Sequence, residues 1–466
     1  MDQQPDDKMR HLAASSPPAP SGELAQPAEL ALRKRQQTDD ASRRFTNLTK
    51  QYAGRQDLAW WPENPKPDPC GRDELFFYRP GQLLVRKAEL PVVKRVLREL
   101  GVEYCSGHDH GKHHEPVVRL LVSSRDPVPV LVRRLRCYGL ESDVVGPNHV
   151  FWPSNLGGLP WLSGGAESIP REVAVSAGPV QMSGSRGENV TVLVFDSGLL
   201  PNWKNWDWLS NVDKIGPSDV EGQGGDLDGP GLDIFDCHAT FVSGILTCTA
   251  PKVTVRVRNV LSELGDVDDH ALCQTIRDTL DHCQLDHCQN VKLVNLSLGG
   301  TTFEDRQPLE MGNLVNEYPH VVFVAAAGNN GPGGAPFWPA SLPNVVGVGA
   351  LTHDGVPAPF SNTNPTSAKV WALGVDVINA FGTGELDYPA GTYHEYQTGR
   401  AAWSGTSFAT PLVTGVLCGY VQSNSSANPS GIGAINHPSG IGAINWLNGV
   451  GRHDPVSGRV IISASP

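Results

Sequence analysis

The chain has 466 residues with a formal net charge of −12, and 39% of its residues are hydrophobic. This composition is enough for a sizeable core and predicts one large domain together with a smaller one. The negative charge argues against nucleic-acid binding, because phosphate recognition needs clustered Lys and Arg. No run of about 18 uncharged apolar residues is present, so the sequence predicts no membrane-spanning segment.

The first third of the chain predicts a polar arm and a small module. Residues 1–72 are polar and Pro-rich, which is typical of a mostly disordered arm. Residues 73–152 predict a small α+β module of the ferredoxin-like, split βαβ type, and the Pro/Gly-rich residues 153–170 predict a linker. Within the module, strands are expected at 81–87, 116–124 and 148–152, and amphipathic helices at 90–101 and 126–140.

Residues 171–466 predict a large α/β domain. Continuous Val-rich apolar runs are typical of strands buried on both faces of a mainly parallel sheet flanked by helices. Segment 268–283 has helical spacing and is expected to be a crossover helix. Functional sites in such sheets gather beyond the carboxyl ends of the strands. The apolar runs occupy residues 189–195, 252–260, 290–298 and 320–328.

Four polar residues stand at the ends of these predicted elements. Taken singly, each has an ordinary structural interpretation: a turn aspartate, a core histidine, a loop asparagine and an N-cap serine. Taken together, they supply the parts of a nucleophilic site, namely an orienting carboxylate, a base, an oxyanion donor and a nucleophile. In this order of roles the residues are Asp196, His238, Asn329 and Ser407.

The motifs around these residues resemble those of the subtilisin-like serine proteases. The similar segments read VFDSG, HATFVSG, NLSLGG, AAAGNNG and SGTSFATP in chain order. One departure is Ala239, which follows His238 where the family has glycine. The resemblance implies a subtilisin-like fold and a serine endopeptidase that acts on polypeptides, with the order Asp…His…Ser along the chain.

The resemblance also assigns roles to individual residues. It implies that Asp196, His238 and Ser407 form the catalytic triad and that Asn329 completes the oxyanion hole. The segment Ser297, Leu298 and Gly299 is implied to pair with the substrate backbone. Ala326 and Gly328 are implied to line the primary pocket, and with no charge nearby we expect uncharged, bulky apolar residues before the cut.

The small module resembles the pro-domain that precedes many subtilases. This resemblance implies a zymogen whose own N-terminal module docks at the cleft, with a cut in the linker at about 152–175. The alternative that the sequence leaves open is an accessory domain that stays attached. Two other functions also remain open: a relative that binds peptides without cutting, and an acid peptidase of the sedolisin type, which uses a glutamate in place of His238.

We expect no cofactor and no catalytic metal, with calcium as a structural ion the alternative. Three segments carry metal-ligand residue types without a defined motif, and solvated loops are the simpler interpretation. These segments are the loop with Asp226, Asp228, Asp233 and Asp236, the loop with His108, His110, His113 and His114, and the helix end with His282, Cys283, His287 and Cys288.

The nine cysteines form no regular disulfide pattern, and the N-terminus contains no signal-peptide core. Both observations predict a cytoplasmic protein, with secretion by another route as the alternative. The segment PSGIGAIN occurs at 429–436 and again at 438–445. Two copies are too few for a solenoid, so we expect a lengthened surface loop.

Overall fold

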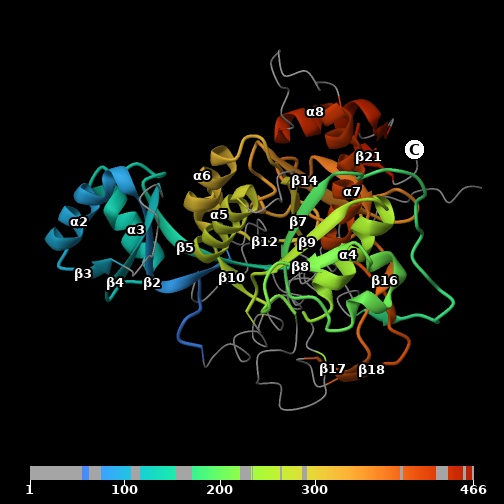
Figure 1. The fold of residues 1–466 in the computed structure, drawn as a ribbon. Helices are drawn as coiled ribbons and strands as arrows, with labels where there is room; N and C mark the ends of the chain where they lie inside the picture. The colour runs from blue at the N-terminus through green and yellow to red at the C-terminus, as the bar shows by residue number, and fades with distance from the viewer. Residues whose placement is uncertain are drawn as a thin grey trace, which may run out of the picture.

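A computed structural model gives the fold of most of the chain (Figure 1). All structural statements below concern its described residues. These are residues 55–61, 75–106, 116–153, 170–220, 232, 235–262, 265–285, 291–388, 392–426, 439–454 and 458–463.

The large domain is built on a nine-stranded sheet in the order β20-β21-β15-β14-β13-β11-β7-β9-β8. Every neighbouring pair is parallel except β20 and β21, which confirms the predicted α/β class. The strands are β7 (Thr191–Asp196), β8 (Val212–Lys214), β9 (Thr254–Asn259), β11 (Val291–Leu296), β13 (Val322–Ala326), β14 (Val345–Leu351), β15 (Val370–Leu373), β20 (Arg452–His453) and β21 (Val460–Ile462).

Helices cover both faces of this sheet, which explains the continuous apolar runs. Along β7, Val192 and Val194 pack into one apolar cluster, while Leu193 and Phe195 pack into another on the opposite face. The first cluster includes residues of α4 (His238–Thr249), α7 (Thr406–Ser426) and α8 (Gly440–Val450). The second includes residues of α5 (Asp269–Leu285) and α6 (Leu309–Glu317).

The N-terminal module has the expected α+β order and an antiparallel sheet, β5-β2-β4-β3. Helices α2 and α3 contribute Val96, Leu97, Leu131 and Leu135 to its apolar core. Strand β3 was not predicted, because three of its four residues are exposed and it lacks apolar alternation. The elements are β2 (Phe76–Arg86), α2 (Leu90–Glu99), β3 (Glu103–Ser106), β4 (Val117–Ser123), α3 (Val128–Cys137) and β5 (Val145–Pro153).

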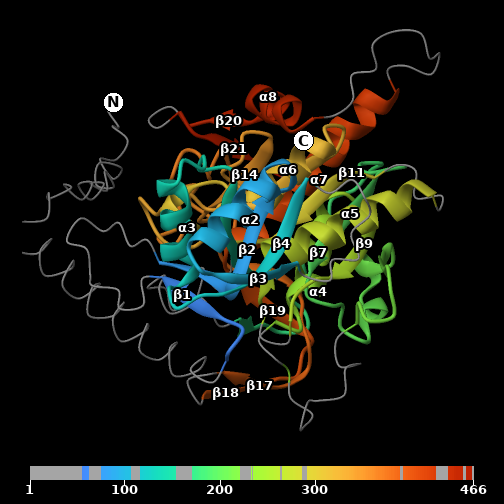
Figure 2. The ribbon, with the colours of Figure 1, turned by 90° about the vertical axis from the view of Figure 1, so that its left-hand side faces the viewer.

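Strand β5 joins the module to the large domain (Figure 1), and in Figure 2 the module with α2 and α3 faces the viewer, in front of the large domain. Its first part pairs with β2 of the module. Farther along, Val150 and Phe151 pair with β10 (Val267–Asp268), and Trp152 and Pro153 pair with β12 (Leu298–Gly299), both antiparallel. In Figure 1 the module accordingly lies beside α5 and α6 at one side of the large domain.

The remaining elements are short. Strands β6, β16 and β19 form a three-stranded sheet, and β17 and β18 form a hairpin. Their bounds are β6 (Arg171–Glu172), β16 (Val377–Ala380), β17 (Gly384–Tyr388), β18 (Thr392–Tyr396) and β19 (Arg400–Trp403), and single 3-10 turns are η1 (Lys87–Glu89), η4 (Trp203–Asn205), η5 (Asp207–Leu209) and η6 (Phe303–Asp305).

Two segments have more regular structure than the sequence predicted. Within the predicted arm, β1 (Ala59–Trp61) pairs with β2, so this short part of residues 1–72 is a strand. The expectation that the PSGIGAIN repeat is a loop was wrong for its second copy, whose residues 440–445 begin helix α8. Ser439 caps that helix by accepting a hydrogen bond from the N–H of Gly442 at 3.1 Å.

The boundaries between arm, module, linker and large domain stay predictions. Most of the predicted linker, residues 154–169, and the first copy of the repeat lie outside the described residues. None of the helices in the described ranges is both long enough and apolar enough to cross a bilayer.

Candidate active site

Asp196 and His238 form a buried hydrogen-bonded pair. Asp196 is the last residue of β7 and His238 the first of α4, and both side chains are fully buried. Nδ1 of His238 lies 2.6 Å from Oδ1 of Asp196. A carboxylate only accepts, so Nδ1 carries the proton and Nε2 is left as the basic nitrogen. Within the described chain, Nε2 has no hydrogen-bond partner.

Ser407 lies in the first turn of α7, next to this pair. The ring of Phe408, which follows it, is 5.6 Å from the His238 ring between centroids. Helices α4 and α7 pack against each other. The Ser407 hydroxyl donates to the backbone oxygen of Ser297 at 2.9 Å. The start of α7 therefore packs against the His238 ring through Phe408, and the Ser407 hydroxyl is bonded to Ser297 in this structure.

Asn329 lies in the loop after β13 and contacts the start of α7. Its Oδ1 atom accepts from the backbone N–H of Thr406 at 3.0 Å and from the Thr406 hydroxyl at 2.8 Å. The side chain is 2% exposed. These two bonds fix the amide oxygen on the helix terminus, and Nδ2 is the donor group of the same amide.

The predicted substrate edge and the predicted pocket residue Gly328 share a neighbour, the ring of Phe337. Leu298 and Gly299 form β12, while Ala326 ends β13 and Gly328 follows it. A methyl group built on Gly299 would lie 2.5 Å from the Phe337 ring, and one on Gly328, at φ 96°, would lie 2.6 Å from it. The ring of Phe337 therefore touches both segments, which the sequence did not reveal.

Polar contacts join the module to the start of α5. Asn148 of β5 accepts from the N–H of His270 at 3.1 Å and donates to Asp268 at 3.0 Å. Arg79 of β2 pairs with Asp266 at 2.8 Å and with Asp268 at 3.1 Å. Burial alone would raise the pKa of Asp266, but hydrogen bonds from Arg55 and Ser262 and the charge of Arg79 lower it overall.

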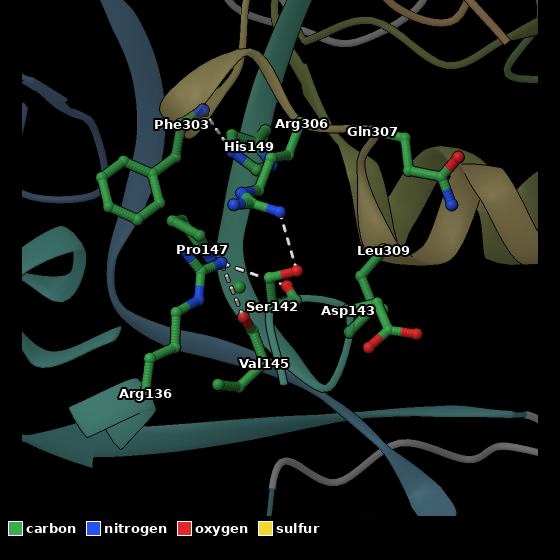
Figure 3. A pocket seen from close by; sticks show the side chains of 11 residues that line it. Arg136, Ser142, Asp143, Val145, Pro147, His149, Phe303, Arg306, Gln307 and Leu309 are labelled. Carbon is green, nitrogen blue, oxygen red and sulfur yellow. Dashed lines mark hydrogen bonds between the residues drawn. The ribbon is translucent and has the colours of Figure 1, made fainter. Parts of the chain in front are cut away.

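A segment of the large domain also enters the module (Figure 3). Phe303 is 2% exposed and belongs to the apolar core of the module. Its backbone N–H donates to Nε2 of His149 at 3.1 Å. Beside it, Glu304 pairs with Arg133 at 3.1 Å and Arg136 at 2.6 Å. A small hollow adjoins these contacts, lined by Arg136, Ser142, Asp143, Val145, Gly146, Pro147, His149, Phe303, Arg306, Gln307 and Leu309.

His149 is held neutral in this position. Burial lowers its pKa to about 3, and the neighbouring charge of Arg136 contributes to the same shift. A protonated imidazole has no acceptor nitrogen, so its Nε2 atom would lose the bond from Phe303. Contact between module and large domain therefore favours the neutral imidazole.

No metal site emerges from the described part of the chain, in which no three His, Cys, Asp or Glu residues converge on one point. Of the aspartate-rich loop, Asp236 is described, and Asp226, Asp228 and Asp233 lie outside the described residues. The loop with His108, His110, His113 and His114 also lies outside them, as do His287 and Cys288. The expectation of no cofactor and no catalytic metal, with calcium as a structural ion the alternative, stays a prediction.

At the end of one strand of the mainly parallel sheet the structure places the hydrogen-bonded pair of Asp196 and His238, and Ser407 lies in the first turn of α7. The model of the subtilase family matches residues 187–435, which is more than half of the chain. The chain belongs to the subtilase family, a family of serine-type endopeptidases.

Several proteases are similar over this region. Subtilisin DY of Bacillus licheniformis is 27% identical over 265 residues, which cover 54% of this chain and 83% of that protein. An intracellular serine protease of Paenibacillus polymyxa is 27% identical over 262 residues, covering 53% and 72%. Subtilisin E of Bacillus subtilis (strain 168) is 26% identical, and the match spans 60% of its length.

Among solved structures, the S218A mutant of the PatA protease domain is similar at 22% identity, covering 61% of this chain and 96% of that one with a TM-score of 0.45. A cold adapted subtilisin-like serine proteinase is similar at 22% identity, covering 62% and 96% with a TM-score of 0.42.

Proposed function

We propose that this protein hydrolyses peptide bonds with Ser407 as nucleophile, His238 as general base and Asp196 as the group that orients it. The observation that carries the proposal is the buried 2.6 Å bond between Asp196 and His238. This bond fixes the tautomer in which Nε2 accepts a proton, and Ser407 lies at the adjacent helix terminus.

The reaction begins with a rotation of the Ser407 side chain. Its hydroxyl now donates to the Ser297 oxygen and must turn about the Cα–Cβ bond to donate to His238 Nε2. Catalytic hydrogen bonds are often made only once substrate is bound. A substrate strand that pairs with Ser297 brings its own N–H to the same carbonyl and so favours the rotation.

The chemical steps then follow from the roles of these groups. His238 takes the hydroxyl proton as Oγ attacks the peptide carbonyl, and the tetrahedral oxyanion forms. Nδ2 of Asn329 and the N–H of Ser407 donate to that oxyanion, supported by the positive end of α7. His238 then protonates the leaving amine, and water hydrolyses the acyl-enzyme by the same path. In subtilisin, loss of the side-chain donor costs on the order of 10² to 10³ in turnover.

Phe337 changes the expected specificity. The sequence predicted bulky apolar residues before the cut, on the assumption that Ala326 and Gly328 line an open pocket. Phe337 is 1% exposed and lies against both Gly299 and Gly328. We therefore propose that the protease prefers small residues such as Ala, Gly or Ser at the position before the cut, because the ring takes the volume that a larger side chain needs.

The N-terminal module is proposed to be an inhibitory pro-domain that docks at the cleft. Its strand β5 pairs with β12, the segment expected to bind substrate backbone. The antiparallel register runs from Trp152 opposite Gly299 to Pro153 opposite Leu298, which is the direction of Ser297 and the nucleophile. We expect the cut in the first residues after Pro153, and the first of these is Ser154, a small residue.

The alternative is an accessory domain that stays attached, and intact mass separates the two. The wild type is expected to lose its N-terminal module, while Ser407→Ala keeps it. An active enzyme that retains the module would eliminate the pro-domain function and leave the peptidase function standing.

Hydrolysis of a peptide library tests the catalytic proposal itself. Ser407→Ala and His238→Ala are each expected to lower turnover by several orders of magnitude, since triad members act as a unit. Binding of peptides without cleavage by the wild type would favour the non-cutting alternative. Activity confined to strongly acid pH would favour the sedolisin type.

A further inference from the structure

We infer that the hydroxyl of Ser297 positions the nucleophile, and that it does so by replacing a hydrogen bond that Pro411 removes from helix α7. This inference rests on the proposed role of Ser407 as nucleophile. It assigns Ser297 a side-chain function in addition to its expected backbone pairing with substrate. Ser297 acts here as a positioning residue, through Ser407.

The need for such a group follows from the sequence of α7. In an α-helix, the N–H of each residue donates to the carbonyl four residues earlier. Residue 411 is proline, which has no N–H, and it lies inside the helix. The Ser407 carbonyl therefore cannot receive its regular helical hydrogen bond, although Ser407 is fully buried.

Ser297 supplies the missing donor. Its Oγ atom donates to the backbone oxygen of Ser407 at 2.8 Å. In return, the Ser407 hydroxyl donates to the backbone oxygen of Ser297 at 2.9 Å. The two serines are joined by reciprocal bonds between the end of β11 and the start of α7, so the substrate edge and the nucleophile are held in register.

Two further buried residues orient the Ser297 hydroxyl. Nδ2 of Asn295 donates to Ser297 Oγ at 3.0 Å, and the Thr414 hydroxyl donates to Oδ1 of Asn295 at 2.9 Å. With one lone pair engaged by Asn295, the hydroxyl hydrogen is directed to Ser407. All four side chains in this chain of bonds are fully buried: Thr414, Asn295, Ser297 and Ser407.

This arrangement explains the polar side chain at Asn295. The residue lies in β11, between β7 and β13, where the neighbouring positions Val294 and Leu296 belong to the apolar core. A buried amide is costly unless its donors and acceptors are paired. Here both ends of the amide are used, and the result is a fixed path of hydrogen bonds from Thr414 of α7 to the nucleophile.

The test combines Ser297→Ala with Pro411→Ala. Ser297→Ala removes the donor to the Ser407 carbonyl, and Pro411→Ala returns a helical N–H to the same carbonyl. Peptide hydrolysis by the full chain is measured for both single variants and for the double variant, together with the melting temperature. Ser243→Ala is the matched control, because that buried serine of α4 has no hydrogen-bond partner for its hydroxyl in the described chain.

Ser297→Ala is expected to lower kcat by on the order of 10-fold or more with a smaller change in KM, since a buried acceptor loses its donor beside the nucleophile. Adding Pro411→Ala is expected to recover most of that loss, whereas Pro411→Ala alone gives no gain. Ser243→Ala is expected to behave as the wild type.

Three outcomes would overturn the inference while leaving the peptidase function intact. These are an unchanged kcat in Ser297→Ala, a lower melting temperature without a kinetic effect, or a kinetic loss that Pro411→Ala does not restore. A wild type that shows no hydrolysis would instead contradict the proposed function itself.

Discussion

Nε2 of His149 in the module accepts a hydrogen bond from the backbone N–H of Phe303 in the large domain, over 3.1 Å. The imidazole is buried, and charged groups face it or lie around the same hollow from several elements. Arg136 comes from α3, and Arg306 and Asp143 come from the adjoining loops, while Glu304 of η6 pairs with Arg136. A contact of this kind makes the docking of the module depend on protonation.

The docked module is therefore expected to lose stability in mild acid. The pKa of His149 is lowered to about 3 when docked, against 6.5 for the free imidazole, through burial and then Arg136. Above pH 6.5 the residue is neutral in both states, so docking is fully stable there. Below pH 6.5 protonation of His149 favours release of the module. The equilibrium constant for docking then falls by at most about tenfold per pH unit.

The melting temperature of the uncut Ser407→Ala protein, measured between pH 7 and 4.5, reports this loss of stability. A second substitution, His149→Gln, keeps an acceptor for Phe303 but does not titrate, so its melting temperature should fall less as the pH drops. Melting temperatures that fall equally with pH in the two proteins would rule out His149 as the source of the pH dependence.

Phe303→Ala is expected to loosen the module. The side chain lies in the module's core at 2% exposure, and loss of a buried phenylalanine costs about 3–5 kcal/mol. Faster removal of the module and a higher initial activity of the full chain should follow, as seen by intact mass over time. Leu121→Ala is the control, because Leu121 is 39% exposed on β4. Equal processing rates in both variants would contradict the anchoring role of Phe303.

Asp196→Asn should leave the fold intact while reducing turnover by about 10⁴, the effect known for the corresponding change in a serine protease triad. The amide presents a donor as well as an acceptor to His238, so the imidazole is no longer held in the tautomer with a basic Nε2. The measurement is kcat for one peptide, with the melting temperature as the control for folding. A loss of less than tenfold would show that Asp196 does not orient the base.

Phe337→Gly is expected to admit larger residues before the cut. Removing the ring opens the space between Gly299 and Gly328, so kcat/KM for peptides with Leu or Phe at that position should rise by at least about tenfold. A peptide with Ala at the same position is the internal control and should change little. An unchanged profile would show that another group limits the pocket.

The sequence predicted the sheet well because of how the sheet is buried. Strands β7, β11 and β13 have apolar neighbours on both faces, and this leaves continuous runs that are easy to recognise, whereas β9 buries one face through Val255 and Val257. Strand β3 carries no such signal, since its exposed residues owe their conformation to pairing with β4. The second PSGIGAIN copy reads as a loop by composition, yet its Ser439 cap and its packing against the core make it a helix.

The predicted site residues were identifiable because chemistry restricts their types, whereas contacts between distant segments were not. Phe337 and Phe303 are ordinary apolar residues in sequence, and their positions become meaningful only when folding places one beside Gly328 and the other in the module. Pro411 is a local signal that the sequence did offer. A proline inside a buried helix implies an acceptor that needs another donor, although the identity of Ser297 required the structure.

Labelling with a fluorophosphonate, followed by mapping of the adduct by mass spectrometry, tests the central claim most directly. Wild-type protein is expected to carry one adduct on Ser407, with labelling strongly slowed in His238→Ala and absent in Ser407→Ala. An adduct on another serine, or the same labelling rate without the imidazole, would contradict a nucleophile activated by His238 and Asp196.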